Sequence, residues 1–136
     1  MEGYKFFDIP VISDGRGNLV VVEQCKQIPF EIKRVFWIFG VPESEKRAGH
    51  AHKLQKQFIV AVSGSFDVLL DNGYEKVSVT LNNPSKGLLI SNGIWLTLEG
   101  FSPDAVCLVM VPEIYNPQDY ISDYTLFLDW KKNFER

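Results

Sequence analysis

The sequence predicts an all-β fold, a sandwich or barrel of short strands with a short helical segment at its C-terminal end. Short apolar and β-branched segments recur along most of the chain and are separated by turn residues. After residue 115 the pattern changes, and apolar residues recur at helical spacing. The 136 residues give room for one substantial core. We therefore expect a single domain, residues 1–136, with the barrel at about 1–115 and the helical segment at about 117–134.

The expected strands follow one another at near-even spacing. The first, Val35–Phe39, is β-branched and aromatic and stops at Gly40. The pair Asn72-Gly73 favours a tight hairpin turn between two later strands, because both residues tolerate positive φ. The other expected strands are Gln57–Val62, Phe66–Leu70, Lys76–Leu81, Gly87–Ile90, Trp95–Leu98 and Ala105–Val111.

The C-terminal segment begins with helix-start signals. Asn116 is a suitable N-cap and Pro117 fits the first helical position. An apolar stripe at helical spacing follows, made of Ile121, Tyr124, Phe127 and Leu128.

Composition excludes several classes of protein. The net charge of −3 argues against a general nucleic-acid binder, which needs a basic face. Apolar runs fall short of the roughly 18 residues that a membrane helix requires. With two cysteines, Cys25 and Cys107, we expect no disulfide framework. Residues 1–5 resemble neither a signal peptide nor a lipidation site, so we expect a cytoplasmic protein.

Both histidines of the chain lie in one short segment, Arg47-Ala48-Gly49-His50-Ala51-His52. On a strand, alternate side chains point to the same face, so His50 and His52 present two imidazoles side by side, with Arg47 close by. Such a pair is suited either to ligating a metal or to moving protons on a substrate.

The spacing around the histidines resembles the two motifs of the cupin superfamily of jelly-roll barrels, also called double-stranded β-helices. The pattern is His50-x-His52, four residues, Gln57, six residues, Gly64, and then Gly87, five residues, Gly93, two residues, Leu96. In cupins a carboxylate stands at the position of Gln57 and a third histidine at that of Leu96. Because stable metal sites use three or four protein ligands, we expect no metal and no cofactor here.

Nearly the whole chain resembles the WxcM-like family of small cupins. The matching segments are Asp14–Leu19, Ile28–Phe30, Lys33–Phe39, Arg47–Lys53, Val62–Ser65, Leu69–Gly73, Gly87–Ile90, Trp95 and Asp119–Ile121. The resemblance implies a metal-independent nucleotide-sugar 3,4-ketoisomerase of deoxysugar and polysaccharide biosynthesis. Such an enzyme converts dTDP-4-keto-6-deoxyglucose to a dTDP-3-keto-6-deoxyhexose through an enediol.

Roles for particular residues follow from that chemistry. His50 and His52 are the expected catalytic acid and base. Arg47 stands close enough to stabilise an anionic enediol. The remaining expected substrate-binding residues are Arg16, Lys33 and Arg34 for the diphosphate, Gln57 at the motif position, and Trp37 and Trp95, with Phe36, as platforms for the thymine.

One departure from the family concerns proton transfer. Relatives often carry a tyrosine at the position of Trp37, where it assists proton transfer, and an indole cannot act as an acid or base near neutral pH. The role could pass to Tyr74 or to a water. Leu96 stands where relatives have a polar residue that influences the C4 configuration, so the sequence leaves the configuration of the product open.

Two alternatives stay open at this point. One is a cupin that binds a nucleotide sugar without turning it over, and the other is a metal-dependent cupin enzyme. We also expect a homodimer, because relatives form dimers in which N-terminal strands pack against the partner's barrel. Tyr4, Phe6 and Phe7 would leave an apolar edge exposed in a monomer.

Overall fold

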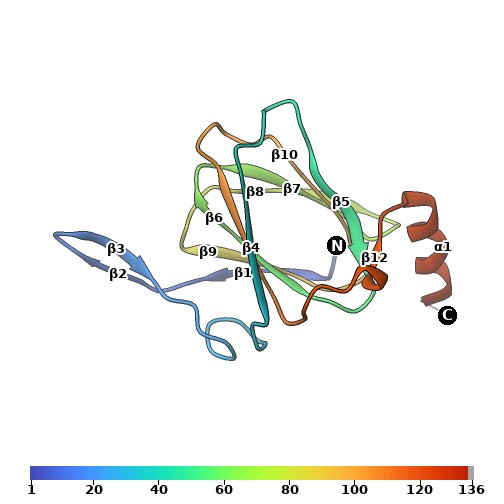
Figure 1. The fold of residues 1–136 in the computed structure, drawn as a ribbon, viewed down its shortest axis with the longest axis horizontal. Helices are drawn as coiled ribbons and strands as arrows, with labels where there is room; N and C mark the ends of the chain where they lie inside the picture. Colours follow the sequence, from blue (N-terminus) through green and yellow to red (C-terminus); the bar gives the residue numbers. More distant parts are fainter. Residues whose placement is uncertain (135–136) are drawn as a thin grey trace.

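The computed structural model describes residues 1–134, which form two antiparallel five-stranded sheets, a separate hairpin and a C-terminal helix (Figure 1). The predicted all-β jelly-roll fold is confirmed, and the predicted strands lie within about a residue of their observed ends. The first sheet has the order β1 (Tyr4–Asp8), β9 (Lys86–Ile90), β6 (Gln57–Ser63), β11 (Val106–Val111) and β4 (Arg34–Phe39). The second has the order β12 (Tyr120–Ile121), β5 (Arg47–His52), β10 (Trp95–Glu99), β7 (Phe66–Asp71) and β8 (Lys76–Leu81).

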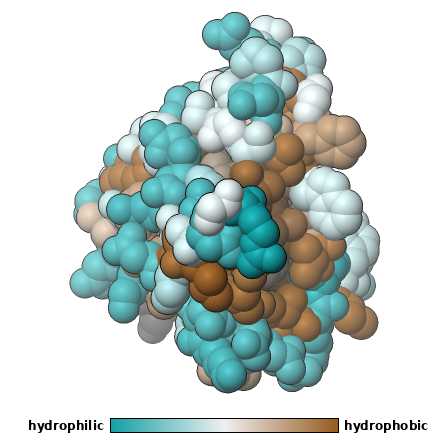
Figure 2. Space-filling model, turned by 90° about the vertical axis from the view of Figure 1, so that its left-hand side faces the viewer, coloured by the Kyte–Doolittle hydropathy of each residue, from teal (hydrophilic) through white to brown (hydrophobic). Residues whose placement is uncertain are grey.

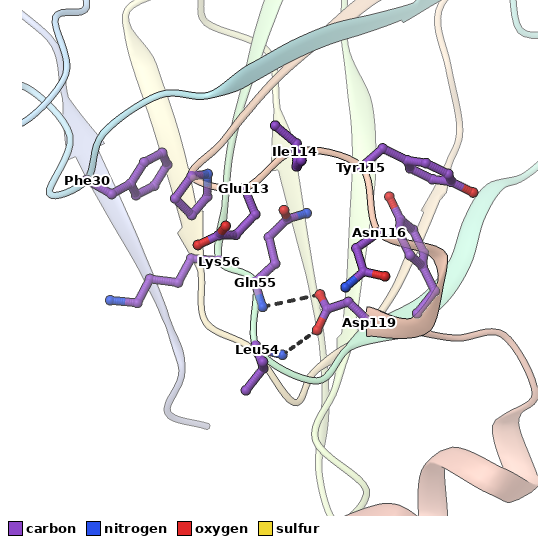
Figure 3. A pocket seen from close by; sticks show the side chains of 11 residues that line it. Phe30, Leu54, Gln55, Lys56, Glu113, Ile114, Tyr115, Asn116 and Asp119 are labelled. Carbon is purple, nitrogen blue, oxygen red and sulfur yellow. Dashed lines mark hydrogen bonds between the residues drawn. The ribbon is translucent and has the colours of Figure 1, made fainter.

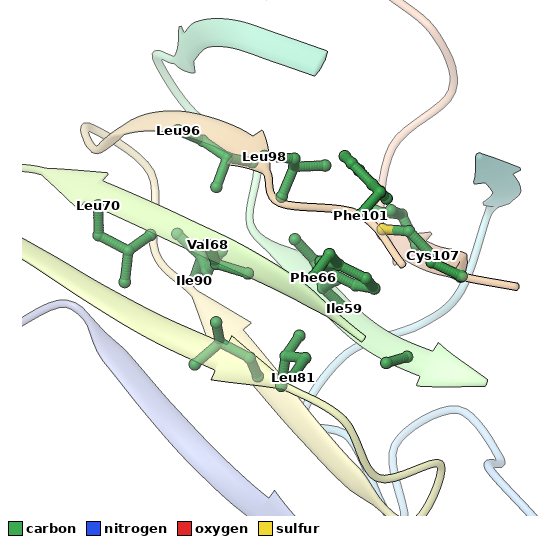
Figure 4. Close-up of a cluster of buried hydrophobic side chains, with 14 of the residues drawn as sticks. Ile59, Phe66, Val68, Leu70, Leu81, Ile90, Leu96, Leu98, Phe101 and Cys107 are labelled. Atoms are coloured by element: carbon green, nitrogen blue, oxygen red, sulfur yellow. The ribbon is translucent and has the colours of Figure 1, made fainter. Parts of the chain in front are cut away.

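The main core lies between the two sheets (Figure 4). Its side chains come from alternate positions of facing strands, as the period of two requires. On β10, for example, Leu96 and Leu98 point into the core, while Trp95 and Thr97 are on the other face. Strand β6 is buried on both faces, because Phe58 and Val60 pack under the segment that contains Ile28 and Phe30. Burial on both faces explains why the sequence of β6 is a nearly continuous apolar run.

The predicted C-terminal helical segment is divided into three pieces. A 3₁₀ turn, η1 (Pro117–Asp119), is capped by Asn116, whose side chain accepts a hydrogen bond from the Gln118 amide. The strand β12 then pairs with β5, and Ile121, expected on the helix, lies in this strand. The placement of Ile121 on the helical stripe was therefore wrong, because tertiary pairing with β5 overrides the local helical spacing, whereas the helix farther along the chain is observed.

Helix α1 (Tyr124–Phe134) covers part of the outer face of the second sheet. It begins after Asp123, whose carboxylate accepts a hydrogen bond from the Leu126 amide at 3.0 Å. Phe127 is fully buried and packs against Ala51 and Trp95. The helix thus supports the back of the strand that carries both histidines. None of the helices within residues 1–134 has the length and apolar character needed to cross a membrane.

A hairpin of β2 (Val11–Asp14) and β3 (Gly17–Val20) projects away from the barrel (Figure 1). Its apolar side chains are exposed, with Ile12 at 60% and Leu19 at 55% of full exposure. Figure 2 views the molecule from the hairpin's side and shows apolar residues gathered around it. This hairpin was not predicted from the sequence, and the exposed apolar surface lies later in the chain than predicted.

The aromatic residues expected to form that edge lie in β1, which pairs with β9. Tyr4 packs against the main core and Phe7 contacts Phe58 edge-on, with ring centroids 5.8 Å apart. Phe6 is 36% exposed. Most of the apolar surface attributed to residues 4–7 is therefore covered within the same chain.

The close approach of β9 to β6 gives a stability prediction. A Cβ added at Gly87 would overlap the ring of Phe58, which is fully buried. We expect Gly87→Ala to lower the free energy of unfolding by about 1–3 kcal/mol, as overpacked core sites do. Urea unfolding measures this change. Gly15→Ala is the matched control, since a Cβ there meets nothing within 4 Å. Equal stability of the two variants would contradict this packing.

Candidate active site

A cavity of about 240 Å³ opens between the two sheets. Apolar side chains from both sheets line part of it, among them Ile59, Leu96, Leu98 and Val109. The polar and aromatic residues that line it are Arg34, Phe36, Arg47, His50, Gln57 and Tyr120, with Trp37, Ile38 and Ala48 completing the wall. The cavity therefore combines an apolar lining with a small set of convergent polar groups, as ligand sites commonly do.

A β-bulge in β5 decides which side chains enter this cavity. In its pairing with β10, His50 lies opposite Leu96 and Ala48 opposite Thr97, so Gly49 is the extra residue. Both Ala48 and Gly49 have positive φ, 67° and 74°. On a regular strand, residues 47 and 50 would face opposite sides because they are three apart. The extra residue places Arg47 and His50 on the same inner face.

The two imidazoles lie side by side, as the sequence predicts. Their ring centroids are 5.1 Å apart, with the rings nearly perpendicular. Tyr120, which pairs with His52 across β12 and β5, packs against both rings, at 4.9 Å from His50 and 4.3 Å from His52. His50 also has a hydrogen bond to the backbone of Ala48 at the bulge. Three ionisable rings thus form one contiguous group.

Asp119 holds His52 and the following loop together. Its Oδ2 lies 3.0 Å from His52 Nδ1 and accepts a hydrogen bond from the backbone amide of Gln55 at 3.3 Å, while its Oδ1 accepts one from the backbone amide of Leu54 at 2.8 Å (Figure 3). Because an ionised carboxylate only accepts, Nδ1 of His52 carries the hydrogen and Nε2 is the unprotonated nitrogen. Asp119 and Tyr120 belong to a segment that resembles the family, but their sequence context predicted no role for either residue.

Arg34 connects the first sheet to this group. Its Nη2 donates a hydrogen bond to the Tyr120 hydroxyl at 3.1 Å, and its guanidinium lies over the rings of Phe36 and Tyr115. Its Nε is buried and has no hydrogen-bond partner within residues 1–134. Since buried donors are nearly always paired, this nitrogen is suited to an acceptor supplied by a ligand.

Burial keeps both histidines neutral at pH 7. Loss of hydration, together with the neighbouring His52, lowers the pKa of His50 to about 4. Burial also lowers the pKa of His52, while the hydrogen bond and the negative charge of Asp119 act in the opposite direction. An imidazolium at His52 therefore has an anionic partner, which makes His52 the more suitable of the two to accept a proton.

Four of the predicted binding residues are placed away from the cavity or only at its rim. Trp95 lies on the outer face of β10 and packs against Tyr124 and Phe127 of α1, so it is a support for the helix. Lys33 is exposed, and its backbone amide bonds to Val111. Trp37 alternates outward with Val35 and Phe39, is 59% exposed and reaches the cavity only at its edge.

Arg16 is the fourth of these residues. It lies at the turn of the projecting hairpin, 91% exposed, and pairs with Asp14 at 2.7 Å. Within one chain it is remote from the histidines (Figure 1). Tyr74, suggested by the sequence as a substitute proton carrier, is exposed in the β7–β8 turn and does not line this cavity. The residues that the structure brings together are therefore His50, His52, Arg34, Arg47 and Gln57.

A second, larger cavity of about 650 Å³ is drawn in Figure 3. It shares Tyr120 with the smaller cavity, and Asp119 forms part of its wall. Its other lining residues come mostly from the loops around Gln55 and Ile114. His50 lines the smaller cavity, with His52 directly beside it, and neither histidine lines the larger one. We therefore assign the reaction centre to the smaller cavity.

The donor groups at the cavity do not form a metal-ligating set. Within residues 1–134, no three His, Cys, Asp or Glu side chains converge on a point that could hold a metal ion. At the two cupin ligand positions, Gln57 and Leu96 line the same cavity as His50. An amide is a weak ligand and leucine is none.

Comparison with known proteins identifies the family. The family model FdtA, described as WxcM-like, C-terminal, matches residues 2–132. The chain belongs to this family. A TDP-4-oxo-6-deoxy-alpha-D-glucose-3,4-oxoisomerase of Aneurinibacillus thermoaerophilus is 39% identical over 97% of this chain and 96% of its own length.

Solved structures of WxcM-like relatives agree with this assignment. A 3,4-ketoisomerase of Helicobacter canadensis superimposes with a TM-score of 0.93 at 36% identity, covering 95% of this chain and 97% of that one. A ketoisomerase variant of Thermoanaerobacterium thermosaccharolyticum, solved with TDP-4-keto-6-deoxyglucose, gives a TM-score of 0.96 at 32% identity, covering 98% and 96%. The predicted resemblance to the WxcM-like family is thus confirmed.

The lowered pKa of His50 predicts a pH-dependent stability. Because the unfolded chain binds a proton at about 6.5 and the folded chain only at about 4, the folded state loses stability as the pH falls through this interval. The loss approaches about 1.4 kcal/mol per pH unit for one histidine. Between about pH 7 and pH 4, the free energy of unfolding should fall less steeply with decreasing pH for His50→Asn than for the wild type. Parallel curves would show that His50 titrates normally.

Proposed function

We propose that this protein converts dTDP-4-keto-6-deoxyglucose to a dTDP-3-keto-6-deoxyhexose, as a metal-independent 3,4-ketoisomerase of deoxysugar biosynthesis. Family membership supports the reaction class, and the named activities of the relatives support the substrate. The observation that carries the mechanism is His50 in a cavity between the sheets, with the neutral His52 and its partner Asp119 directly beside it.

The reaction moves one hydrogen between two carbons and one between two oxygens. A base removes the proton from C3 of the 4-keto sugar, and the electrons move to O4 to give an enediol. When the proton returns at C4, O3 becomes the carbonyl. His52 is suited to take the C3 proton through Nε2, because Asp119 stabilises the imidazolium that forms. His50 is suited to accept a hydrogen bond from a substrate hydroxyl.

Two arginines provide the positive charge that the substrate needs. Arg47 lines both the histidine cavity and the adjoining groove of about 380 Å³ that is bordered by residues 37–42. This position suits a diphosphate that joins a sugar in the cavity to a nucleoside in the groove. Arg34 presents its unpaired Nε next to the histidine group, where negative charge develops on the enediol oxygens.

The donor set supports metal independence. Only two imidazoles are present, one of which already bonds to Asp119, and the remaining cupin positions hold Gln57 and Leu96. The polarising role that a metal plays in other enzymes falls here to the guanidinium of Arg34 and its neighbours.

We further propose that the active form is a homodimer in which the β2–β3 hairpin packs on the partner. The hairpin exposes Ile12 and Leu19, and the edge strand β4 exposes Trp37 and Phe39 beside the cavity. An exposed apolar sheet edge and an exposed apolar hairpin can cover each other in a symmetric pair. In such a dimer Arg16, at the hairpin turn, would approach the partner's cavity and could bind the substrate there.

The acid–base assignment predicts the effect of removing each imidazole. His50→Asn and His52→Asn should each lower kcat by on the order of 10²-fold, since no other imidazole is available. Turnover of dTDP-4-keto-6-deoxyglucose, followed by NMR of the product, measures this loss and shows the C4 configuration. Circular dichroism confirms that each variant folds. Near-wild-type rates in both variants would refute the assignment.

The same assay separates the alternatives. A protein that binds the nucleotide sugar without converting it would show no product at any enzyme concentration. A metal-dependent enzyme would contain stoichiometric metal and lose activity with a chelator, whereas we expect neither.

The proposed dimer predicts an effect of charge on the hairpin. The wild-type chain should run at twice the monomer mass of 15.5 kDa in light scattering at micromolar concentration. Ile12→Asp combined with Leu19→Asp should shift the protein to monomer and reduce turnover, because Arg16 leaves the partner's cavity. Leu126→Asp on α1, also exposed, is the matched control and should stay dimeric. A wild-type monomer would refute the dimer.

A further inference from the structure

The proposed reaction needs a side chain that moves a proton between O3 and O4 of the sugar. As O4 changes from ketone to hydroxyl, a proton must be donated to it, and a proton must leave O3 later. The side chain that handles these protons needs a hydrogen that it can both give and take back. The indole of Trp37 cannot do this, and it faces mainly outward.

Neither histidine can donate that proton in its resting state. The N–H of His52 is directed at Asp119, and that of His50 at the backbone of Ala48. Each neutral ring has a single N–H, so the nitrogens left for the substrate are acceptors. The low pKa of His50, about 4, keeps its second nitrogen unprotonated at pH 7.

The other polar groups of the cavity are excluded by their chemistry. Arg34 and Arg47 donate hydrogen bonds but do not release a proton near neutral pH, and the amide of Gln57 does not titrate. Among the described residues that line the cavity, Tyr120 alone has a hydroxyl group. Its ring lies against both histidines, so its hydroxyl belongs to the same group of side chains.

The hydrogen bond from Arg34 prepares this hydroxyl for proton transfer. Arg34 Nη2 donates to the phenol oxygen at 3.1 Å, so the phenol's own hydrogen is directed to another acceptor. The guanidinium charge also stabilises the phenolate that remains after the hydrogen is given away. Since Arg34 and Tyr120 come from opposite sheets, the fold itself brings the two together.

We propose that Tyr120, held by Arg34, transfers the oxygen-bound proton between O3 and O4 while His52 transfers the carbon-bound one. His52 first removes the C3 proton, and the Tyr120 O–H bond then breaks as a new O–H bond forms at the negatively charged O4. The phenolate then takes the proton from O3, whose electrons form the C3 carbonyl as C4 receives its proton from the imidazolium. Both side chains end the cycle as they began it, and no oxidant or further reactant is needed.

This inference rests on the proposed ketoisomerase function, and Tyr120→Phe tests it. The substitution keeps the ring against the histidines and removes only the hydroxyl. We expect kcat to fall by on the order of 10²-fold, with KM and the affinity for dTDP within about twofold of wild type. Tyr115→Phe is the matched control, because the Tyr115 ring contacts the Tyr120 ring at a tilt, with centroids 5.6 Å apart, and is 61% exposed. This variant should keep wild-type kcat.

Isotope effects distinguish proton transfer from a structural role. If the oxygen-to-oxygen step becomes rate-limiting in Tyr120→Phe, the solvent deuterium isotope effect on kcat rises and the effect of deuterium at C3 falls. A loss of activity with unchanged isotope effects, a rise in KM alone, or a kcat close to wild type would each overturn the inference. Should Tyr120→Phe fail to fold, 3-fluorotyrosine at position 120 keeps the shape and lowers the phenol pKa, and an unchanged kcat would overturn the proposal.

The wild type and His52→Asn separate this inference from the function on which it rests. Absence of turnover in the wild type would refute the proposed function itself. Turnover in the wild type, its loss in His52→Asn and its persistence in Tyr120→Phe would refute only the role of Tyr120.

Discussion

The carboxylate of Asp119 is the constraint on which the candidate site depends. It bonds at once to His52 and to the backbone amides of Leu54 and Gln55, so it fixes both the imidazole and the loop after β5. It also anchors the short strand β12, which places Tyr120 opposite His52. A group that is 12% exposed and accepts three hydrogen bonds can hold this arrangement rigidly. One side chain therefore sets the tautomer of His52 and the position of its neighbour.

A second constraint is the bulge at Ala48 and Gly49. A non-glycine residue at positive φ costs free energy, of order 1–3 kcal/mol, and such strain persists where the surrounding structure requires it. Here the bulge moves Arg47 to the inner face and provides the backbone group that bonds to His50. The local strain thus brings a cation and an oriented imidazole into the same cavity.

The inner and outer faces of the two sheets have different roles. Inward positions supply the apolar lining and the reacting groups, and the outer face of β10 uses Trp95 to seat α1 behind the histidine strand. Within residues 1–134, no strand pairs with the outer edge of β4, which exposes Trp37 and Phe39. The same strand that contributes Arg34 to the site is thus the one available to a second copy of the chain, which would couple assembly to the site.

The sequence by itself determined the fold class, most of the strands, the pairing of His50 with His52 and the family. These depend on local patterns: the period of two along strands, turn residues, and motif spacing. It also indicated Arg34, Arg47 and Gln57 through the resemblance. The period of two alone could not tell which face of β4 or β10 points inward, and so Trp37 and Trp95 were assigned to a cavity that they do not line in depth.

Only the tertiary structure decided the roles of Asp119 and Tyr120. Asp119 lies 67 residues beyond His52 in the sequence, and Tyr120 is the next residue. No local sequence pattern connects either residue to His52. Their segment reads as the start of a helix, yet pairing with β5 draws it into the sheet. Long-range backbone pairing outweighs a helical preference of a few tenths of a kcal/mol per residue, and that pairing is what the chain's local sequence does not encode.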